Sequence, residues 1–280
     1  QGSNCWSSLK RAAGRISYDD DAVTKRLEKG VSNLIHHNTS SFLRFVERFI
    51  AGEDVHKADG NKTYAIMLYY ALFQDKISKT GYSSINEALE LIHSSKYACF
   101  KQEIAEIVSY LLSRLDIKTT PIGAEIIPGL ELYGCYTREE VFTLVGRQTA
   151  EVKMQGAASG SFNLPEHNAV LLFVTLNKSE KDFSPSTQYN DYLINEEYFH
   201  WQSKNTDSHY NSGGRKYVEQ PKTGIKIILF VRDEKKDGFG NTSPFHCFGL
   251  VDYISSHDDC PMNVKWKLQK PAMAQYLKAI

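Results

Sequence analysis

The feature that most constrains this fold is a change in hydrophobic periodicity near residue 120. Before it, apolar residues recur at the three- and four-residue spacing of amphipathic helices, as in segment 40–53. Pro121 and Gly123 then break the helical pattern. The sequence therefore predicts a helical bundle up to about residue 115. The shared apolar face of segment 40–53 consists of Phe42, Phe45, Val46 and Phe49.

Beyond the break, the chain carries short apolar and β-branched runs bounded by turn residues, which predict strands. These runs are 169–176, 223–233, 246–256 and 262–268, and one more helix is expected over 137–146. We predict an α+β chain: an N-terminal helical, coupler-like domain over 1–125, then a β-rich domain over 126–280. The β-rich part is a compact barrel or a strongly curved sheet, and the 137–146 helix belongs to it.

Charge and composition exclude several classes of protein. The 280 residues hold 33 basic and 33 acidic side chains, so the chain lacks the basic excess of a simple nucleic-acid binder. No apolar run approaches membrane-spanning length. Five scattered cysteines without a CxxC pair indicate a reduced, cytoplasmic protein. The opening Gln1-Gly2-Ser3 resembles a protease-cleavage scar, so we expect a piece of a longer protein.

Sequence motifs for catalysis are missing. The chain has no GxxxxGK[ST] phosphate loop, no HExxH and no GxSxG. No nucleophile–base motif supports independent hydrolase activity, so we expect no catalytic residues. We also expect no metal: the first of two candidate clusters matches no standard zinc spacing, and the acidic turn residues of the second are interpreted as solvated. The Gly pair in segment 211–217 is interpreted as a hairpin tip. The two clusters are His246, Cys247, His257 and Cys260, and Asp252, His257, Asp258 and Asp259.

Segment 179–203 gathers aromatic side chains among carboxylates, hydroxyls and amides, with few aliphatic neighbours. A disordered linker would avoid aromatic residues. Two interpretations are open: the rings line a pocket for a flat molecule, or they fill a core.

Several phrases resemble a domain described as of unknown function. They are the run from Leu172 to Ser203, then "ILFVRD", "FGLVDYISS" and "PMNVKWKL" in that order. This domain follows bacterial superfamily-2 helicases, often behind a phospholipase D-like nuclease. The resemblance covers about residues 130–275 and is looser over the helical half. The best understood proteins of this layout are SauUSI-type, modification-dependent (type IV) restriction endonucleases of bacterial defence.

The resemblance implies that the chain is a coupler followed by an SRA-like target-recognition domain that reads 5-methylcytosine in DNA. The helicase and nuclease domains would lie N-terminal in the parent chain. We therefore expect no enzyme activity and no cofactor in this piece; ATP and Mg belong to the missing motor and nuclease. The expected partners are methylated duplex DNA and the parent's own domains, with a possible homodimer through the parent and no membrane.

Reading one base by flipping requires stacking rings, a carboxylate acceptor and phosphate contacts around the nucleotide. Arg232, at the end of a strand, is expected to fill the gap in the duplex or to bind phosphate. For each ring, core packing remains the alternative. The candidates for the base pocket are Trp201, Tyr189, Tyr192, Phe199, Asp182 and Asp191. The candidates for the DNA backbone are Lys178, Lys181, Ser184, Thr187 and Arg232.

A second function from another class is a protein–protein coupling module of a helicase, without modified-base specificity. The neutral charge favours this alternative. Comparing the binding of methylated and unmethylated duplexes at low salt separates the two functions.

Overall fold

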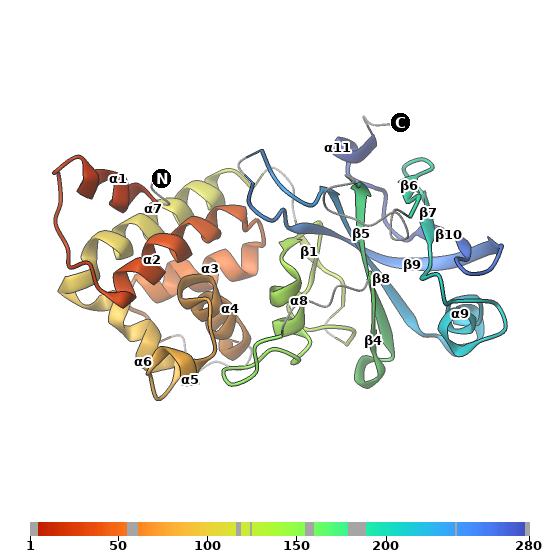
Figure 1. The fold of residues 1–280 in the computed structure, drawn as a ribbon, viewed down its shortest axis with the longest axis horizontal. Helices are drawn as coiled ribbons and strands as arrows, with labels where there is room; N and C mark the ends of the chain where they lie inside the picture. The colour runs from red at the N-terminus through yellow and green to blue at the C-terminus, as the bar shows by residue number, and fades with distance from the viewer. Residues whose placement is uncertain are drawn as a thin grey trace. The chain divides into compact units, whose positions relative to one another are not determined.

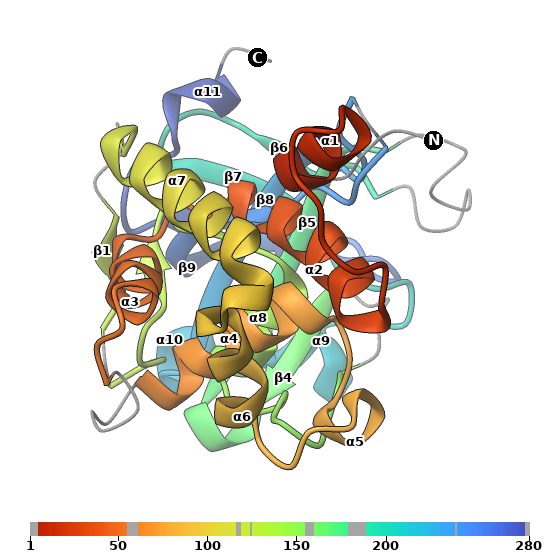
Figure 2. The ribbon, with the colours of Figure 1, turned by 90° about the vertical axis from the view of Figure 1, so that its left-hand side faces the viewer.

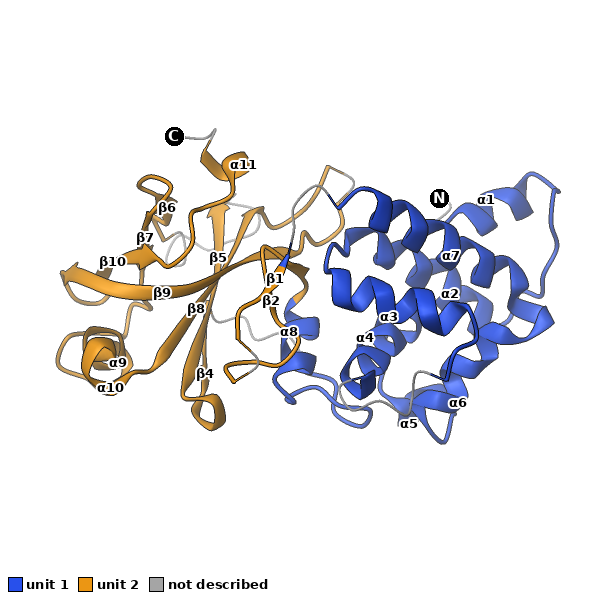
Figure 3. Cartoon of the chain, turned by 180° about the vertical axis from the view of Figure 1, so that it is seen from behind, with its two compact units in different colours: residues 1–119, 138–155 blue, residues 120–137, 156–280 orange. Residues whose placement is uncertain are grey.

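In the computed structural model, the chain forms two compact units (Figures 1 and 3). The helical unit comprises residues 1–119 and 138–155, and the sheet unit comprises residues 120–137 and 156–280. This division confirms the α+β class predicted from the change in periodicity. The structure describes residues 5–54, 61–115, 119–123, 125–154, 160–178, 189–238 and 240–277.

In the helical unit, α7 packs against α3 and α2, and α2 packs against α4 (Figure 2). The apolar face predicted for segment 40–53 is confirmed, because all four of its residues are buried on α3. The helices are α1 (Trp6–Ala12), α2 (Ala22–Asn33), α3 (Ser40–Ile50), α4 (Asn61–Phe73), α5 (Ile77–Thr80), α6 (Ile85–Glu90), α7 (Ala98–Ser113) and α8 (Arg138–Leu144), with 3-10 turns η1 (Leu34–His36), η3 (Leu91–His93) and η4 (Ser95–Tyr97).

Side-chain caps explain where two of these helices begin. At α2, the Asp21 carboxylate accepts from the Thr24 backbone N–H at 2.8 Å, and the Thr24 hydroxyl accepts from the Asp21 N–H at 3.0 Å. At α6, the Ser84 hydroxyl accepts from the Glu87 N–H at 3.1 Å. The Glu87 carboxylate accepts from the N–H of Ser83, one residue before the cap, at 2.8 Å. These bonds satisfy N–H groups that have no partner within the helix.

Helix α8 groups with the helical unit, whereas the sequence placed it in the β-rich domain. On α8, Glu140 Oε1 lies 3.0 Å from Nε2 of the buried His37. After the helix, the Thr149 carbonyl accepts from the Tyr70 hydroxyl at 2.7 Å, and the Ala150 carbonyl accepts from the Ile77 N–H at 2.9 Å. These long-range bonds explain the placement, and periodicity alone cannot reveal them.

The sheet unit contains a mixed eight-stranded sheet in the order β4-β5-β8-β9-β10-β7-β6, with β3 paired to β9. Strands β5 and β8 are parallel, and the other paired neighbours are antiparallel. The sheet does not close into a barrel, which excludes one of the two predicted forms. A separate two-stranded pair consists of β1 (Thr120–Pro121) and β2 (Glu131–Leu132), and η5 (Pro165–His167) is a 3-10 turn. The strands of the large sheet are β3 (Cys135–Tyr136), β4 (Ser161–Leu164), β5 (Ala169–Asn177), β6 (Tyr192–Leu193), β7 (Tyr198–Gln202), β8 (Lys226–Glu234), β9 (Phe245–His257) and β10 (Asn263–Leu268).

Burial differs between the central and the outer strands. Strands β5 and β8 are buried on both faces over most of their length, as their continuous apolar runs predict. On one of these faces, Phe173 stacks on Phe230 with ring centroids 4.9 Å apart. Strand β7 is buried at alternate residues only. This alternation gives the sheet one apolar face and one accessible face at its β10-β7-β6 end.

Helices α9 (Ser212–Val218) and α10 (Gln220–Thr223) lie against β9, and α11 (Ala274–Leu277) adds Tyr276 to the same core. The hairpin tip predicted for segment 211–217 is wrong. The Asn211 side chain caps α9 by accepting from the Gly214 N–H at 3.1 Å, and Tyr217 packs edge-on against Trp201. Among the helices in the described ranges, none has the length and apolar character needed to cross a membrane.

Candidate nucleic-acid interface

Strand β7 presents its side chains to two different environments. Phe199 and Trp201 are 0% and 4% exposed and belong to the hydrophobic core. Tyr198, His200 and Gln202 alternate with them and therefore lie on the opposite face of the strand. The rings of Phe199 and Trp201 are therefore buried in this structure and not accessible for stacking on a base. Core packing, the alternative kept for each ring, is what is observed for these two.

Neighbouring strands extend the accessible face of β7. Register places His200 beside Tyr192 of β6 and beside Lys265 of β10. The rings of Tyr192 and His200 stack, with centroids 4.6 Å apart and an angle of 14° between their planes. The Lys265 ammonium lies 4.4 Å from the ring centroid of Tyr198. We call this surface the outer face; its residues are Tyr192, Tyr198, His200, Gln202, Asn263, Lys265 and Lys267.

The outer face combines exposed aromatic rings with cations. Tyr192 is 44% exposed. Lys267 is exposed and is paired in the strand register with Asp252 of β9, whereas Lys265 lies between His200 and Ser255. Aromatic planes with adjacent cations on an open sheet suit stacking of bases and contact with phosphates.

A buried ion pair holds the segment that precedes β6. Lys178 Nζ lies 2.7 Å from Asp191 Oδ2, and their side chains are only 8% and 4% exposed. Lys178 also donates to the Tyr189 carbonyl at 2.6 Å, and Asp191 Oδ1 accepts from the Gln202 N–H at 2.8 Å. Burial raises the pKa of Asp191, while the ammonium of Lys178 acts in the opposite direction. Both charges are thus used inside the fold, which leaves neither free for a base or a phosphate here.

Arg232 is also held within the fold. Its Nε donates to the Thr175 hydroxyl at 2.9 Å, and its Nη1 donates to the Ser243 carbonyl at 2.9 Å. The guanidinium carbon lies 4.2 Å from the ring centroid of Phe245, and the residue is 7% exposed. The expected role of Arg232 in the DNA duplex therefore has no support in this arrangement, because the side chain braces β5 and β8.

The remaining candidates divide into two groups. Tyr192 lies on the outer face, and Tyr189 is half-buried just before it, with its carbonyl bound to Lys178. The structure thus places three candidates in the segment beside β7: Tyr189, Asp191 and Tyr192. Asp182, Lys181, Ser184 and Thr187 lie outside the described residues.

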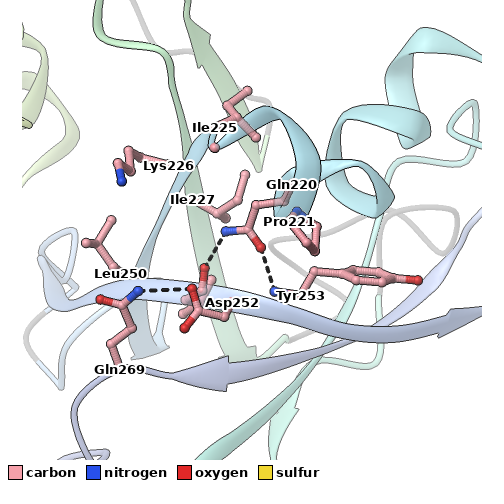
Figure 4. Close-up of a pocket in the computed structure, with 11 residues that line it drawn as sticks. Gln220, Pro221, Ile225, Lys226, Ile227, Leu250, Asp252, Tyr253 and Gln269 are labelled. Carbon is pink, nitrogen blue, oxygen red and sulfur yellow. Dashed lines mark hydrogen bonds between the residues drawn. The ribbon is translucent and has the colours of Figure 1, made fainter.

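A cavity of about 300 Å³ lies where β8 begins beside β9 (Figure 4). The Gln220 amide donates to the Val251 carbonyl at 2.7 Å and accepts from the Tyr253 N–H at 2.6 Å, which satisfies the backbone of β9 beyond the start of β8. Gln269 donates to the Asp252 carboxylate at 2.9 Å. Apolar side chains complete the wall; they are Pro221, Ile225, Ile227 and Leu250.

Sequence reasoning missed Tyr198, His200 and Lys265 as surface residues, and missed the cavity. The alternation at 198–202 was a usable signal, but Tyr198 and His200 are themselves aromatic and disguised it. The cavity had no local signal, because its polar lining comes from positions 220, 252 and 269. Among the described residues, no group of three or more His, Cys, Asp and Glu side chains is placed to hold a metal ion.

Comparison with known proteins identifies the C-terminal part of the chain. A family model described as "Domain of unknown function (DUF3427)" matches residues 130–279. The match coincides with the segment whose phrases carry the sequence resemblance and includes the outer face, the cavity and α8. A search of curated proteins found no match.

Proposed function

This chain belongs to the DUF3427 family, and we propose that it is the DNA-binding target-recognition module of an ATP-dependent, modification-dependent restriction enzyme. The observation that carries the proposal is the outer face. It displays the stacked pair Tyr192–His200 and the cation–ring pair Lys265–Tyr198 on an open sheet. An SRA-like recognition fold and motor domains in the parent chain are parts of the same proposal.

The chemistry of the outer face suits nucleic acid despite the neutral charge of the chain. Stacking on an aromatic side chain contributes about 1–3 kcal/mol per base and requires no net charge. Within the part of the chain that the structure describes, the cations on this face are Lys265 and Lys267, and Asp252 is the register partner of the second. We therefore expect about two phosphate contacts, so log K should fall against log salt with a slope of about −2.

Base reading requires a pocket as well as a platform. The core burial of Trp201 and Phe199 removes them from such a pocket, and we assign the role to the cavity beside Gln220. There the Asp252 carboxylate can accept the cytosine amino hydrogens. Pro221 and Ile225 offer an apolar wall for a 5-methyl group. A flipped 5-methylcytosine is the ligand that this combination of groups favours.

The test is a titration of the 280-residue chain with matched duplexes that carry or lack 5-methylcytosine, across a salt series. We expect tighter binding of the methylated duplex, with preference lost in Asp252→Asn and retained in the neighbouring exposed variant Asp258→Asn. Equal binding of both duplexes at every salt concentration would exclude methyl reading. Absence of binding to either duplex would exclude the DNA function altogether.

A coupling module without base specificity remains the second candidate. The observation that favours it is the acidic residue next to the outer face: Asp252 of β9 is paired in the strand register with Lys267. In that case the outer face would contact a protein domain of the parent chain. Loss of DNA binding in the titration, with retained binding to a separately purified helicase part, would select this candidate.

A further inference from the structure

A serine, a histidine and an aspartate from separate parts of the sheet unit form a continuous hydrogen-bonded series. Asp259 Oδ1 lies 2.9 Å from His209 Nδ1, and His209 Nε2 lies 2.7 Å from Ser256 Oγ. Ser256 is on β9, Asp259 is in the turn between β9 and β10, and His209 precedes α9. The arrangement is that of a nucleophile, a base and an orienting carboxylate.

The hydrogen-bonding capacity of the groups fixes their roles when the imidazole is neutral. Hydrogen bonds from the His209 backbone and ring lower the pKa of Asp259, so this carboxylate is ionised at neutral pH and can only accept. The single ring proton therefore lies on Nδ1, and Nε2 accepts from the Ser256 hydroxyl. Tyr253, whose hydroxyl lies 2.8 Å from Ser256 Oγ, must then donate to that oxygen.

The surrounding backbone holds the series in place. The His209 N–H donates to Asp259 Oδ1 at 2.7 Å, so both the ring and the backbone of His209 bind one carboxylate. The turn that presents Asp259 has positive φ angles on either side of it, +58° at Asp258 and +57° at Cys260. Backbone in this region is costly for residues other than glycine and is often found at functional sites.

Solvent can reach the series. The side chains of His209 and Asp259 are 28% and 37% exposed, and Ser256 is half-buried. The next residue after His209 is Tyr210, which is 87% exposed. A small electrophile can therefore approach Ser256 from the surface without unfolding of the core.

We propose that Ser256 is a nucleophile that hydrolyses small carboxylic esters, with His209 as the general base and Asp259 as the residue that positions it. Ser256 Oγ forms a bond to the ester carbonyl carbon while its proton passes to His209 Nε2. The carbon–oxygen bond of the ester breaks, and the alcohol leaves with the proton from His209. Water then attacks the acyl-serine and gives a proton to His209; the acid leaves, and Ser256 regains its proton.

The order of the three residues explains why no motif marks them. His209 comes first, and Ser256 and Asp259 follow on one β-hairpin, so the series forms only when the segment before α9 folds over that hairpin. The expectation that the chain lacks a nucleophile–base pair rested on short local motifs. Such triads are recognised by geometry, and their order along the chain differs between folds.

The test is labelling of the full chain with a fluorophosphonate probe, with the labelled residue mapped by mass spectrometry and p-nitrophenyl acetate turnover measured alongside. We expect label on Ser256, and a rate reduced at least about a hundredfold in Ser256→Ala and His209→Ala. Ser255→Ala is the matched control, because it removes a hydroxyl from the adjacent, exposed position of the same strand. This control should label and turn over like the unchanged chain.

Two results would overturn the proposal. One is an unchanged chain whose Ser256 labels no faster than Ser255, a result that depends on no variant folding correctly. The other is turnover that persists in Ser256→Ala at the rate of the Ser255→Ala control. In either case the hydrogen-bonded series serves only to fasten the segment before α9 to the hairpin. DNA binding by the outer face is measured separately and is unaffected by either outcome.

Discussion

The two faces of β7 consist of similar side chains and differ in their neighbours. Phe199 and Trp201 lie among buried aliphatic and aromatic residues, whereas Tyr198 and His200 lie beside Lys265 and Tyr192. Both faces are rich in rings, so aromatic content alone does not locate a binding surface. What distinguishes the outer face is the cation and the second ring that cross-strand register brings to it.

The largest expected difference between the two faces is in stability. Trp201→Ala should lower the free energy of unfolding by about 3–5 kcal/mol, because it leaves a cavity beside Tyr217 and Trp266. Tyr198→Ala, on the other face of the same strand, should cost far less, about 1 kcal/mol or below. Denaturant unfolding followed by circular dichroism measures both. Equal losses would mean that the two faces are not distinct.

The buried pair Lys178–Asp191 should give a slightly smaller loss. Lys178→Met leaves the Asp191 carboxylate buried without a countercharge, at a cost of about 3 kcal/mol. The loss stays at the low end of the range because burial already raises the pKa of Asp191, which can take up a proton. Lys222→Met is the control, since Lys222 is exposed on α10. If the two variants unfold alike, the pair does not hold the segment before β6.

His246 should make the stability of the sheet unit depend on pH. Burial lowers its pKa from the usual 6.5 to about 4, and its Nδ1 lies 2.6 Å from the Tyr276 hydroxyl. The unfolded chain therefore binds a proton that the folded chain excludes. This contribution is complete above about pH 6.5 and is lost as the pH falls toward 4.

From pH 7.5 to pH 5, the loss attributable to His246 should be about 2 kcal/mol in the free energy of unfolding. Unfolding in denaturant at the two pH values measures it, and His246→Leu should remove this part of the difference. A His246→Leu variant with the full pH dependence of the unchanged chain would assign the effect to other groups.

Much of the fold follows from local sequence patterns. The apolar face of α3 and the doubly buried strand β5 were predictable, because their periodicity comes from their own residues. The placement of α8 was not predictable, because it depends on the bond between Glu140 and His37, about a hundred residues apart. The helix α9 was missed because its Gly pair argued for a turn, whereas the Asn211 cap and the burial of Tyr217 stabilise a helix.

The candidate site was predictable only as a region. The sequence pointed to segment 179–203, and Tyr192 does lie on the outer face. The sequence could not show which of Trp201 and His200 is buried, because a one-residue shift in a strand exchanges the buried and exposed faces. Lys265 was out of reach, since its position over Tyr198 depends on the pairing of β10 with β7.

The smallest expected effect tests the outer face directly. Tyr192→Ala should weaken duplex binding about tenfold, near the low end of the ~1–3 kcal/mol range for a stacked base, because His200 already covers one face of the ring. Its stability should change little, because Tyr192 is 44% exposed. Tyr110→Ala is the matched control: Tyr110 is 54% exposed on α7 of the helical unit, so its removal should leave affinity unchanged.

Lys265→Gln should weaken the binding of methylated and unmethylated DNA alike and reduce the salt slope by about one. Fluorescence anisotropy across a salt series reads all three variants. If Tyr192→Ala and Tyr110→Ala bind DNA equally well, the outer face is not where DNA binds. Its aromatic rings would then lie together only because of how β6, β7 and β10 pair.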